Sequence, residues 1–284
     1  MTAIASADLA RWIGKTETVT DSVTATPYAA LSATLDRGPE RPPAGTALPP
    51  LWHWLYFLPL YRQSEVGPDG HAKRGGFLPP VPLPRRMWAG SRMEFFRPLR
   101  IGEAIRRESH ITDVNAKEGR SGTLVFVTVR HEIASGNERL LTDEHDIVYR
   151  GLDTGAGAPA PKTAPCDHRW MREIRPTPVL LFRYSALTFN SHRIHYDYPY
   201  VTGVEGYRGL VVHGPLLATL LLDLLAREMP DARVTHFQFR AVSPLFDNAS
   251  FAVCGRPNDD GKTIALWAKG DDGRLAMDAT AMIA

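Results

Sequence analysis

The sequence predicts an α+β protein made of two similar halves, each with a helix and a run of antiparallel strands. Two runs of four apolar-polar segments lie at residues 91–150 and 234–283, with Gly or Asn turns between the segments. The segment RPLRIGEAI at residues 97–105 also resembles SPLFDNASF at residues 243–251. In both segments a strand ends in Pro-Leu, turns and starts another strand. We therefore expect one architecture that occurs twice.

The composition is that of a folded protein with a sizeable core. Of 284 residues, 44% are hydrophobic and 23% are charged. The net charge of +2 is weaker than the basic bias of a general nucleic-acid binder. The longest apolar stretch, Pro215–Leu225, contains Asp223 and is shorter than the ~20 residues that a membrane span needs. We therefore expect a protein that binds neither nucleic acid nor membrane.

Two features indicate the compartment. Cys166 and Cys254 are too few to build a disulfide framework, which fits a reducing environment. The first residues, MTAIASADLARWIG, lack the basic segment and apolar core of a secretion signal. A cytoplasmic location is therefore expected.

The first half is expected to span residues 1–150. Ala7–Ile13 and Tyr28–Leu35 are predicted as short amphipathic helical pieces, and the aromatic run Leu51–Tyr61 is the best candidate for the central helix. Residues 67–84 are rich in Gly and Pro, and such a long irregular segment favours a binding loop over a spacer. Strands are expected at residues 91–99, 103–117, 123–133 and 139–150.

The second half is expected to span residues 166–284, after a flexible linker at 151–165 and a further irregular region. Pro215 suits the first turn of a helix that is apolar almost all round and therefore buried. Strands are expected at residues 234–245, 249–257, 262–270 and 274–283. An antiparallel sheet wrapped on a central helix, present twice, is the layout of a tandem (double) hotdog fold. Two unrelated α+β domains are the alternative.

Chemically active side chains are densest at residues 189–198, FNSHRIHYDY. Gly214 follows at the start of the buried helix, where unpaired N–H groups and a partial positive charge are presented. Such an N–H group stabilises the enolate oxygen of a thioester. A neutral imidazole nearby transfers the proton of water or of the α-carbon. The pattern favours reversible hydration of an α,β-unsaturated thioester.

The segment LTFNSHRIHYDYPY, followed by GYRGLVVHGPLLATLLLDLL, resembles the catalytic half of MaoC-like hydratases and dehydratases. LWHWLYFLP, GHAKRGGFLPPVPLPRRMWAGS and FFRPLRIGE resemble the N-terminal hotdog of its double-hotdog branch. That branch includes mitochondrial-type 3-hydroxyacyl-thioester dehydratases and the hydratases of 3-methylfumaryl-CoA and itaconyl-CoA. The resemblance implies a cofactor-free hydro-lyase that acts on a CoA thioester. Whether the protein forms a homo-oligomer of fused double hotdogs stays open.

The resemblance also implies roles for single residues. His195 matches the catalytic histidine, and Gly214 matches the residue whose N–H polarises the thioester. Asn190 stands where the family has an aspartate, and an amide orients water but cannot accept a proton at neutral pH. His192 and Asp197 are therefore candidates for a second proton carrier, although Asp197 also suits a helix cap or an arginine pair.

Substrate-binding candidates lie in both halves. Arg85, Arg86 and Trp88 are expected in a loop, where they suit a carboxylated acyl chain or CoA phosphates, with a solvated turn as the alternative. Arg193, Arg208 and His213 are weaker candidates. No metal site is expected, since neither a cysteine pair nor HExxH spacing is present.

The expected substrate is a short branched dicarboxylic acyl-CoA, such as 3-methylfumaryl-CoA (mesaconyl-CoA) or itaconyl-CoA, with citramalyl-CoA as the product. Two alternatives stay open. One is a 3-hydroxyacyl dehydratase of fatty acid synthesis, and the other is a hotdog thioesterase or acyl-CoA binding protein.

Overall fold

The computed structural model describes residues 9–38, 41–119, 122–151 and 161–284. Strands of the first half are β1 (Thr16–Ser22), β2 (Arg85–Phe95), β3 (Ala104–Gly119), β4 (Gly122–Ser135) and β5 (Glu138–Arg150). Strands of the second half are β6 (Trp170–Ile174), β7 (Val234–Ala241), β8 (Phe251–Pro257), β9 (Thr263–Gly270) and β10 (Leu275–Ile283). Helices are α2 (Ala25–Thr34), α3 (Pro178–Leu187), α4 (Tyr198–Gly203) and α5 (Gly214–Glu228), with single 3-10 turns η1 (Trp52–Leu55), η2 (Gln63–Glu65) and η3 (Arg193–His195).

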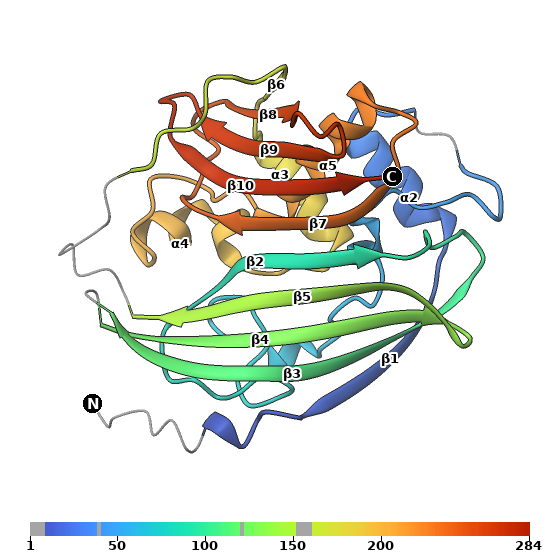
Figure 1. Cartoon of the computed structure of the whole chain (residues 1–284). Helices are drawn as coiled ribbons and strands as arrows, with labels where there is room; N and C mark the ends of the chain where they lie inside the picture. The colour runs from blue at the N-terminus through green and yellow to red at the C-terminus, as the bar shows by residue number, and fades with distance from the viewer. Residues whose placement is uncertain (1–8, 39–40, 120–121, 152–160) are drawn as a thin grey trace.

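The strands form one ten-stranded antiparallel sheet in the order β1-β3-β4-β5-β2-β7-β10-β9-β8-β6 (Figure 1). From the outer edge to the centre, the order β6-β8-β9-β10-β7 of the second half corresponds to the order β1-β3-β4-β5-β2 of the first half. The halves meet where residues 90–94 of β2 pair with residues 236–240 of β7. This pairing leaves neither strand with an open edge at the centre of the sheet. The predicted repeat of architecture and the tandem hotdog layout are confirmed.

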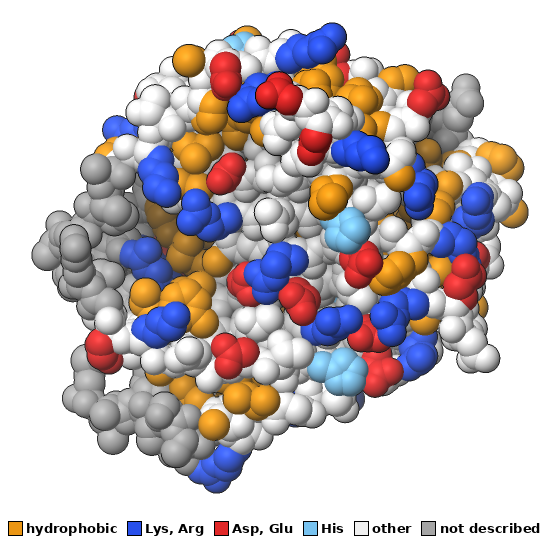
Figure 2. All heavy atoms as spheres, in the orientation of Figure 1, with side chains coloured by type: hydrophobic (Ala, Val, Ile, Leu, Met, Phe, Trp, Pro, Cys, Tyr) orange, Lys and Arg blue, Asp and Glu red, His pale blue; other side chains and the backbone are white. Residues whose placement is uncertain are grey.

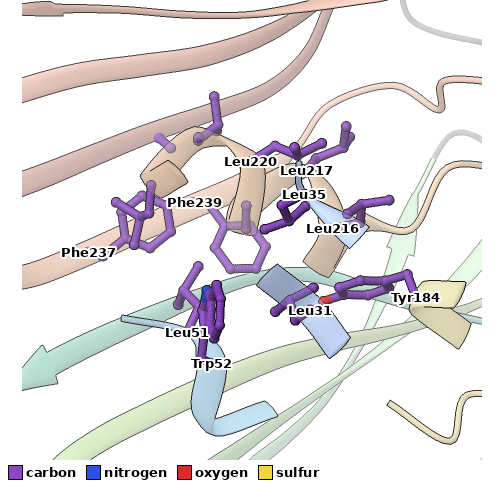
Figure 3. Close-up of a cluster of buried hydrophobic side chains, with 14 of the residues drawn as sticks. Leu31, Leu35, Leu51, Trp52, Tyr184, Leu216, Leu217, Leu220, Phe237 and Phe239 are labelled. Atoms are coloured by element: carbon purple, nitrogen blue, oxygen red, sulfur yellow. The ribbon is translucent and has the colours of Figure 1, made fainter. Parts of the chain in front are cut away.

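The core lies behind the sheet, where α5 packs against β8, β9 and β10. Leucines of α5 meet Leu31 of α2 and Leu35 directly after it, together with Leu51 and Trp52 (Figure 3). This buried cluster takes residues from both halves. The two halves therefore share one hydrophobic core, which fixes the start of α5 relative to the loops of the first half.

The helix predicted at Leu51–Tyr61 is wrong. Leu51 and Phe57 have left-handed backbone angles, φ 71° and 55°, which a helix of L-residues does not accept. Only the short turn η1 forms, and it is held by the buried carboxylate of Asp143. One oxygen of that carboxylate accepts hydrogen bonds from the Trp54 indole at 3.0 Å and from His145 at 2.7 Å.

The helix of the first half is α2, which packs against α3 of the second half. Its span agrees with the amphipathic piece predicted at residues 28–35 but begins earlier. The inner face of the first sheet is covered instead by the Gly/Pro-rich segment, whose Val81 and Leu83 pack on Val125 and Val127. This cover brings an irregular segment of the first half close to the second half.

Three further expectations need correction. The Thr-rich segment at residues 16–22, predicted between two helical pieces, forms the edge strand β1. The irregular region expected after the linker contains β6 and α3. Arg85, Arg86 and Trp88 lie on strand β2, not in a loop, because β2 begins six residues earlier than predicted. The linker residues 152–160 and the first eight residues lie outside the described part of the chain.

The outer face of the sheet carries charges of both signs, with apolar side chains between them (Figure 2). Arg92 on β2 pairs with Glu144 and Asp146 of β5, for example, in contacts of 3.1 and 2.5 Å. Among the described residues, no helix has the length and the apolar character to cross a membrane.

Candidate active site

The segment predicted to carry chemistry begins where α3 ends. Phe189 takes a left-handed conformation with φ 50°, which turns the chain sharply after the helix. The Asn190 backbone N–H donates to the Ser185 carbonyl at 2.8 Å, and the Asn190 side-chain oxygen accepts the backbone N–H of His192 at 3.0 Å. These bonds hold the turn and leave the amide nitrogen of Asn190 as its remaining donor.

His195 is buried and fixed in one orientation. Its Nδ1 hydrogen-bonds to the Val211 carbonyl at 2.7 Å. A carbonyl only accepts, so Nδ1 carries the proton and the Nε2 atom of the neutral ring keeps its lone pair. Burial lowers the pKa of His195 to about 4, although the Val211 carbonyl opposes the shift. The ring is therefore neutral near pH 7 and suited to accept a proton.

The His195 ring lies beside the start of α5. It stacks on His213 with ring centroids 3.6 Å apart and ring planes 17° apart. His213 is fully buried, hydrogen-bonds to the Ser185 hydroxyl at 2.8 Å, and directly precedes Gly214. A Cβ added at Gly214 would meet no atom within 4 Å, so the space that a side chain would take there is open. The histidine and the helix N-terminus thus come together as predicted.

A loop of the first half docks onto this segment. Gly70 approaches so closely that an added Cβ would lie 1.8 Å from the Ser191 carbonyl oxygen. The Ser191 hydroxyl donates to the Gly70 carbonyl at 2.5 Å, and the Arg193 backbone N–H donates to the Asp69 carbonyl at 2.9 Å. Tyr61 adds a 2.9 Å hydrogen bond to the same Ser191 hydroxyl. The Gly/Pro-rich segment therefore belongs to the site.

This loop carries a histidine that sequence reasoning missed. His71 donates from Nδ1 to Asp69 Oδ2 at 3.1 Å, and its ring packs on His192 with centroids 4.0 Å apart. The His192 ring in turn meets His195 edge-on at 5.5 Å. A continuous row of histidine rings results. The only sequence signal was an Asp-Gly-His triplet inside a segment already expected to bind.

Among the described residues, one group of side chains has the spacing of metal ligands. One atom each of Asp69, His71 and His192 lies within 4.8 Å of the others. The Asp69–His71 hydrogen bond and the packing of His71 on His192 account for this closeness without an ion. The expectation that no metal is needed stays a prediction.

The two candidates for a second proton carrier have different surroundings. Asp197 caps α4 by accepting the Tyr200 backbone N–H at 3.1 Å, and it pairs with Arg193 at 2.8 Å. The Tyr200 N–H and Arg193 hold the pKa of Asp197 below its usual range. Burial, then the neighbouring charges of His71 and His195, lower the pKa of His192 strongly. Both alternatives weighed for Asp197, the cap and the arginine pair, are present.

The arginine candidates separate by their partners. The Arg85 guanidinium donates to the Glu205 carboxylate at 3.2 Å and to the Glu205 backbone carbonyl at 2.7 Å. These contacts join β2 to the second half. Arg193 pairs with Asp197 and lies over the Tyr200 ring. Arg208 is exposed over Phe246. Arg86 hydrogen-bonds to the Tyr149 side chain, and its charge lowers the pKa of His71 and of His192.

Trp88 lies on the same strand as these arginines, but its indole points to another cluster. Its N–H donates to the Gly90 carbonyl and to the Ser91 hydroxyl, both at 3.0 Å. Its ring packs on His145 at 4.1 Å, next to the buried Asp143. These contacts hold the inner face of the first sheet.

The buried histidines make acid stability a test of this arrangement. Burial lowers the pKa of five of them below the usual 6.5, namely His71, His131, His192, His195 and His213. Below pH 6.5 the unfolded chain binds protons that the folded chain rejects, so protonation favours unfolding. We expect the free energy of unfolding to fall as the pH drops from 7.5 to about 5.5. Urea denaturation at both pH values measures this, and equal stabilities would contradict it.

Comparison with known proteins places the chain in a family. The hydroxyacyl-thioester dehydratase type 2 family matches residues 51–247, which include both the docked loop and the histidine segment. The chain belongs to this family. It is therefore a hydro-lyase of acyl thioesters, as the MaoC-like resemblance implied.

A curated relative is similar over almost the whole chain. Mesaconyl-C(4)-CoA hydratase of Chloroflexus aurantiacus is 50% identical over 278 residues, which covers 98% of each chain. A solved MaoC-like dehydratase aligns with a TM-score of 0.74 at 15% identity, covering 97% of this chain and 99% of that one. A Mycobacterium tuberculosis protein described as a double hotdog aligns with a TM-score of 0.59 at 14% identity, covering 98% and 97%. These two structures support the fold.

Proposed function

We propose that this protein adds water reversibly to the double bond of a short, branched dicarboxylic enoyl-CoA. The candidates are 3-methylfumaryl-CoA, the mesaconyl thioester, and itaconyl-CoA, both giving citramalyl-CoA. The observation that carries the reaction type is the fixed His195 ring, with Nε2 unprotonated, beside the open start of α5. The end-to-end similarity to a mesaconyl-C(4)-CoA hydratase supports the substrate class.

The reaction needs an anchor for the thioester oxygen. The backbone N–H of Gly214 is the first of the helix N-terminus, where intrahelical partners are lacking and the helix dipole is positive. An N–H aimed at this oxygen stabilises the enolate that forms when the β-carbon is attacked. Gly214 therefore polarises the double bond in this proposal.

The attacking water needs a base and an orienting group. Nε2 of His195 accepts the proton of the water as its oxygen bonds to the β-carbon. Asn190 spends its side-chain oxygen on the His192 N–H, so its amide nitrogen donates to the water oxygen. The α-carbon then takes a proton, either from His195 or from a second group.

The second carboxylate of the substrate needs a cation inside the site. Arg86 fits this role, because it lies on β2 opposite Tyr149, whose neutral side chain is its partner, and its charge reaches His71 and His192. Neighbouring Arg85 is engaged by Glu205. A guanidinium binds a carboxylate through two parallel N–H donors, which gives both affinity and orientation.

Arg86→Ala is expected to raise KM for the dicarboxylic substrate about 10- to 150-fold, the cost of one charge-assisted contact. KM for crotonyl-CoA, which lacks the second carboxylate, is expected to change little. Arg85→Ala is the matched control, since Arg85 is the adjacent arginine on the same strand. Loss of the conjugated double-bond absorbance gives the rates, and the mass gain of one water identifies the product.

Several outcomes contradict parts of this proposal. Equal KM effects of Arg86→Ala on both substrates would assign the arginine to the CoA moiety or to the fold. Faster turnover of straight-chain 3-hydroxyacyl thioesters than of branched dicarboxylic ones would favour the dehydratase of fatty acid synthesis. Release of free thiol from a saturated acyl-CoA would favour a thioesterase.

A further inference from the structure

We propose that His71, held by Asp69, is the second acid–base group of the site and exchanges the proton at the α-carbon. The inference rests on the proposed hydration of an enoyl thioester. Such a reaction moves two protons, one from the water and one to the α-carbon. Asn190 cannot accept a proton at neutral pH, so the histidine segment itself lacks a carboxylate free for this task.

The docked loop places His71 within the row of rings that leads to His195. His71 packs on His192 at 4.0 Å, and His192 meets His195 at 5.5 Å. The loop has little freedom, because the Asp69 and Gly70 carbonyls both accept hydrogen bonds from the segment 191–193. His71 is therefore a fixed part of the site, although it lies more than 120 residues away in sequence.

Among the three rings of this row, His71 has a carboxylate partner and the other two do not. His195 donates to a neutral carbonyl, and no described residue hydrogen-bonds to the His192 ring. Asp69 accepts from His71 Nδ1 at 3.1 Å, which leaves Nε2 as the working atom and balances the charge of an imidazolium. An imidazole backed by a carboxylate can hold and release a proton at the substrate.

The proposed step balances its protons and electrons. In hydration, the water oxygen bonds to the β-carbon while one water proton passes to Nε2 of His195. Solvent first protonates Nε2 of His71, and the charge of Asp69 stabilises this form. The electron pair of the double bond moves onto the thioester enolate, which then takes that proton at the α-carbon. Solvent later removes the proton from His195. Dehydration follows the same path in reverse, with neutral His71 as the base at the α-carbon.

The charges around His71 suit a proton that is released easily. Burial lowers the pKa of His71, Arg86 on β2 and Arg74 in the loop lower it further, and Asp69 raises it. Next to it, His192 packs from the other half. Burial works against the ionised form of Asp69, yet its hydrogen bonds and attraction to His71 hold the pKa of the carboxyl below its usual range. Asp69 is therefore ionised and available as a counter-charge.

The experiment separates the two proton transfers. His71→Asn keeps a donor near the position of Nδ1 and removes Nε2, while Asp69→Asn keeps the side-chain oxygen that accepts the His71 backbone N–H. One assay follows hydration of an enoyl-CoA. The other follows wash-in of deuterium from heavy water at the α-carbon of a saturated acyl-CoA, which has no double bond and needs no attack by water.

His71→Asn is expected to lower kcat for hydration about 100- to 10,000-fold with KM nearly unchanged, and to abolish α-deuterium wash-in. His195→Asn is expected to lose hydration but to keep wash-in. Asp69→Asn is expected to lose about 10- to 150-fold in kcat. In the pH profile of this variant, the limb that reports protonation of His71 is expected to move to lower pH, because the carboxylate that raises the pKa of His71 is gone. His110→Asn, at a half-buried histidine paired with Glu108 on β3, is the control.

Normal hydration and wash-in by His71→Asn would overturn the inference, as would a rise in KM with unchanged kcat. Loss of activity with a chelator and its return with zinc would also overturn it, since Asp69, His71 and His192 would then hold a metal. If His71→Asn does not fold, Asp69→Asn decides through the shifted pH limb and the loss of wash-in. A wild-type enzyme that hydrates no enoyl-CoA overturns the proposed function, whereas wash-in still tests His71.

Discussion

His195→Ala is expected to lower kcat about 100- to 10,000-fold, because it removes the group that we propose as the base for the attacking water. KM for the CoA thioester is expected to stay nearly unchanged, since the Gly214 N–H and the cation Arg86 are untouched. The ring leaves a space beside His213, on which it stacks at 3.6 Å. Steady-state rates with the best enoyl-CoA, together with circular dichroism for folding, measure the effect.

The pH profile distinguishes a base from a packing residue. With a pKa of about 4, His195 is neutral at pH 6 and above, so its role as a base is fully available there and is lost as the pH falls through 4. The acidic limb of the wild-type profile should therefore be missing from the residual activity of His195→Ala. Near-normal turnover by His195→Ala beside an inactive His192→Ala would show that the neighbouring histidine is the base.

The strands that the sequence predicts correctly are those whose side chains alternate between core and solvent. β4, for example, places Val125, Val127 and Val129 in the core with partly exposed residues between them. Eight strands carry a signal strong enough to predict them. The edge strands β1 and β6 do not, because most side chains of Thr16–Ser22 are exposed and β6 has only five residues. A strand that buries few side chains shows no alternation of apolar and polar residues by which it could be predicted.

The first-half helix fails for a different reason. Leu51–Tyr61 is apolar because it is buried, and Trp52, Leu55 and Tyr56 all lie in the core. Burial alone does not distinguish a helix from an irregular segment that covers a sheet. Here the left-handed Leu51 and Phe57 and the hydrogen bond from Trp54 to Asp143 decide the conformation. Both depend on the tertiary structure.

The candidate site likewise combines residues that the sequence identifies with residues that only the fold brings to the site. His195, Asn190 and Gly214 are identifiable from sequence because they lie within 25 residues of one another and match a contiguous family pattern. Asp69 and His71 belong to a glycine-rich segment of the other half, and only the docking of that segment brings them to His192. One sequence does not reveal such a contact. Its clearest trace is Gly70, where the two segments touch.

Gly70→Ala is expected to reduce kcat about 100-fold, the loss typical of a catalytic group displaced by about 1 Å. The new Cβ would lie 1.8 Å from the Ser191 carbonyl oxygen, a backbone atom that cannot move without shifting the Asn190–His195 segment. The loop must then separate from that segment, which removes His71 from the row of rings. The backbone also has φ +90° at Gly70, a conformation that costs an L-residue about 1–3 kcal/mol.

Gly75→Ala is the matched control for this substitution. Gly75 lies in the same loop with φ +95°, but an added Cβ meets only the Pro80 side chain at 4.0 Å. Gly75→Ala therefore carries the same backbone strain without the collision. We expect both variants to lose similar unfolding free energy to strain, whereas kcat and α-deuterium wash-in collapse only in Gly70→Ala. Equal losses of activity in the two variants would mean that strain in the loop, and not its contact with Ser191, is what the site depends on.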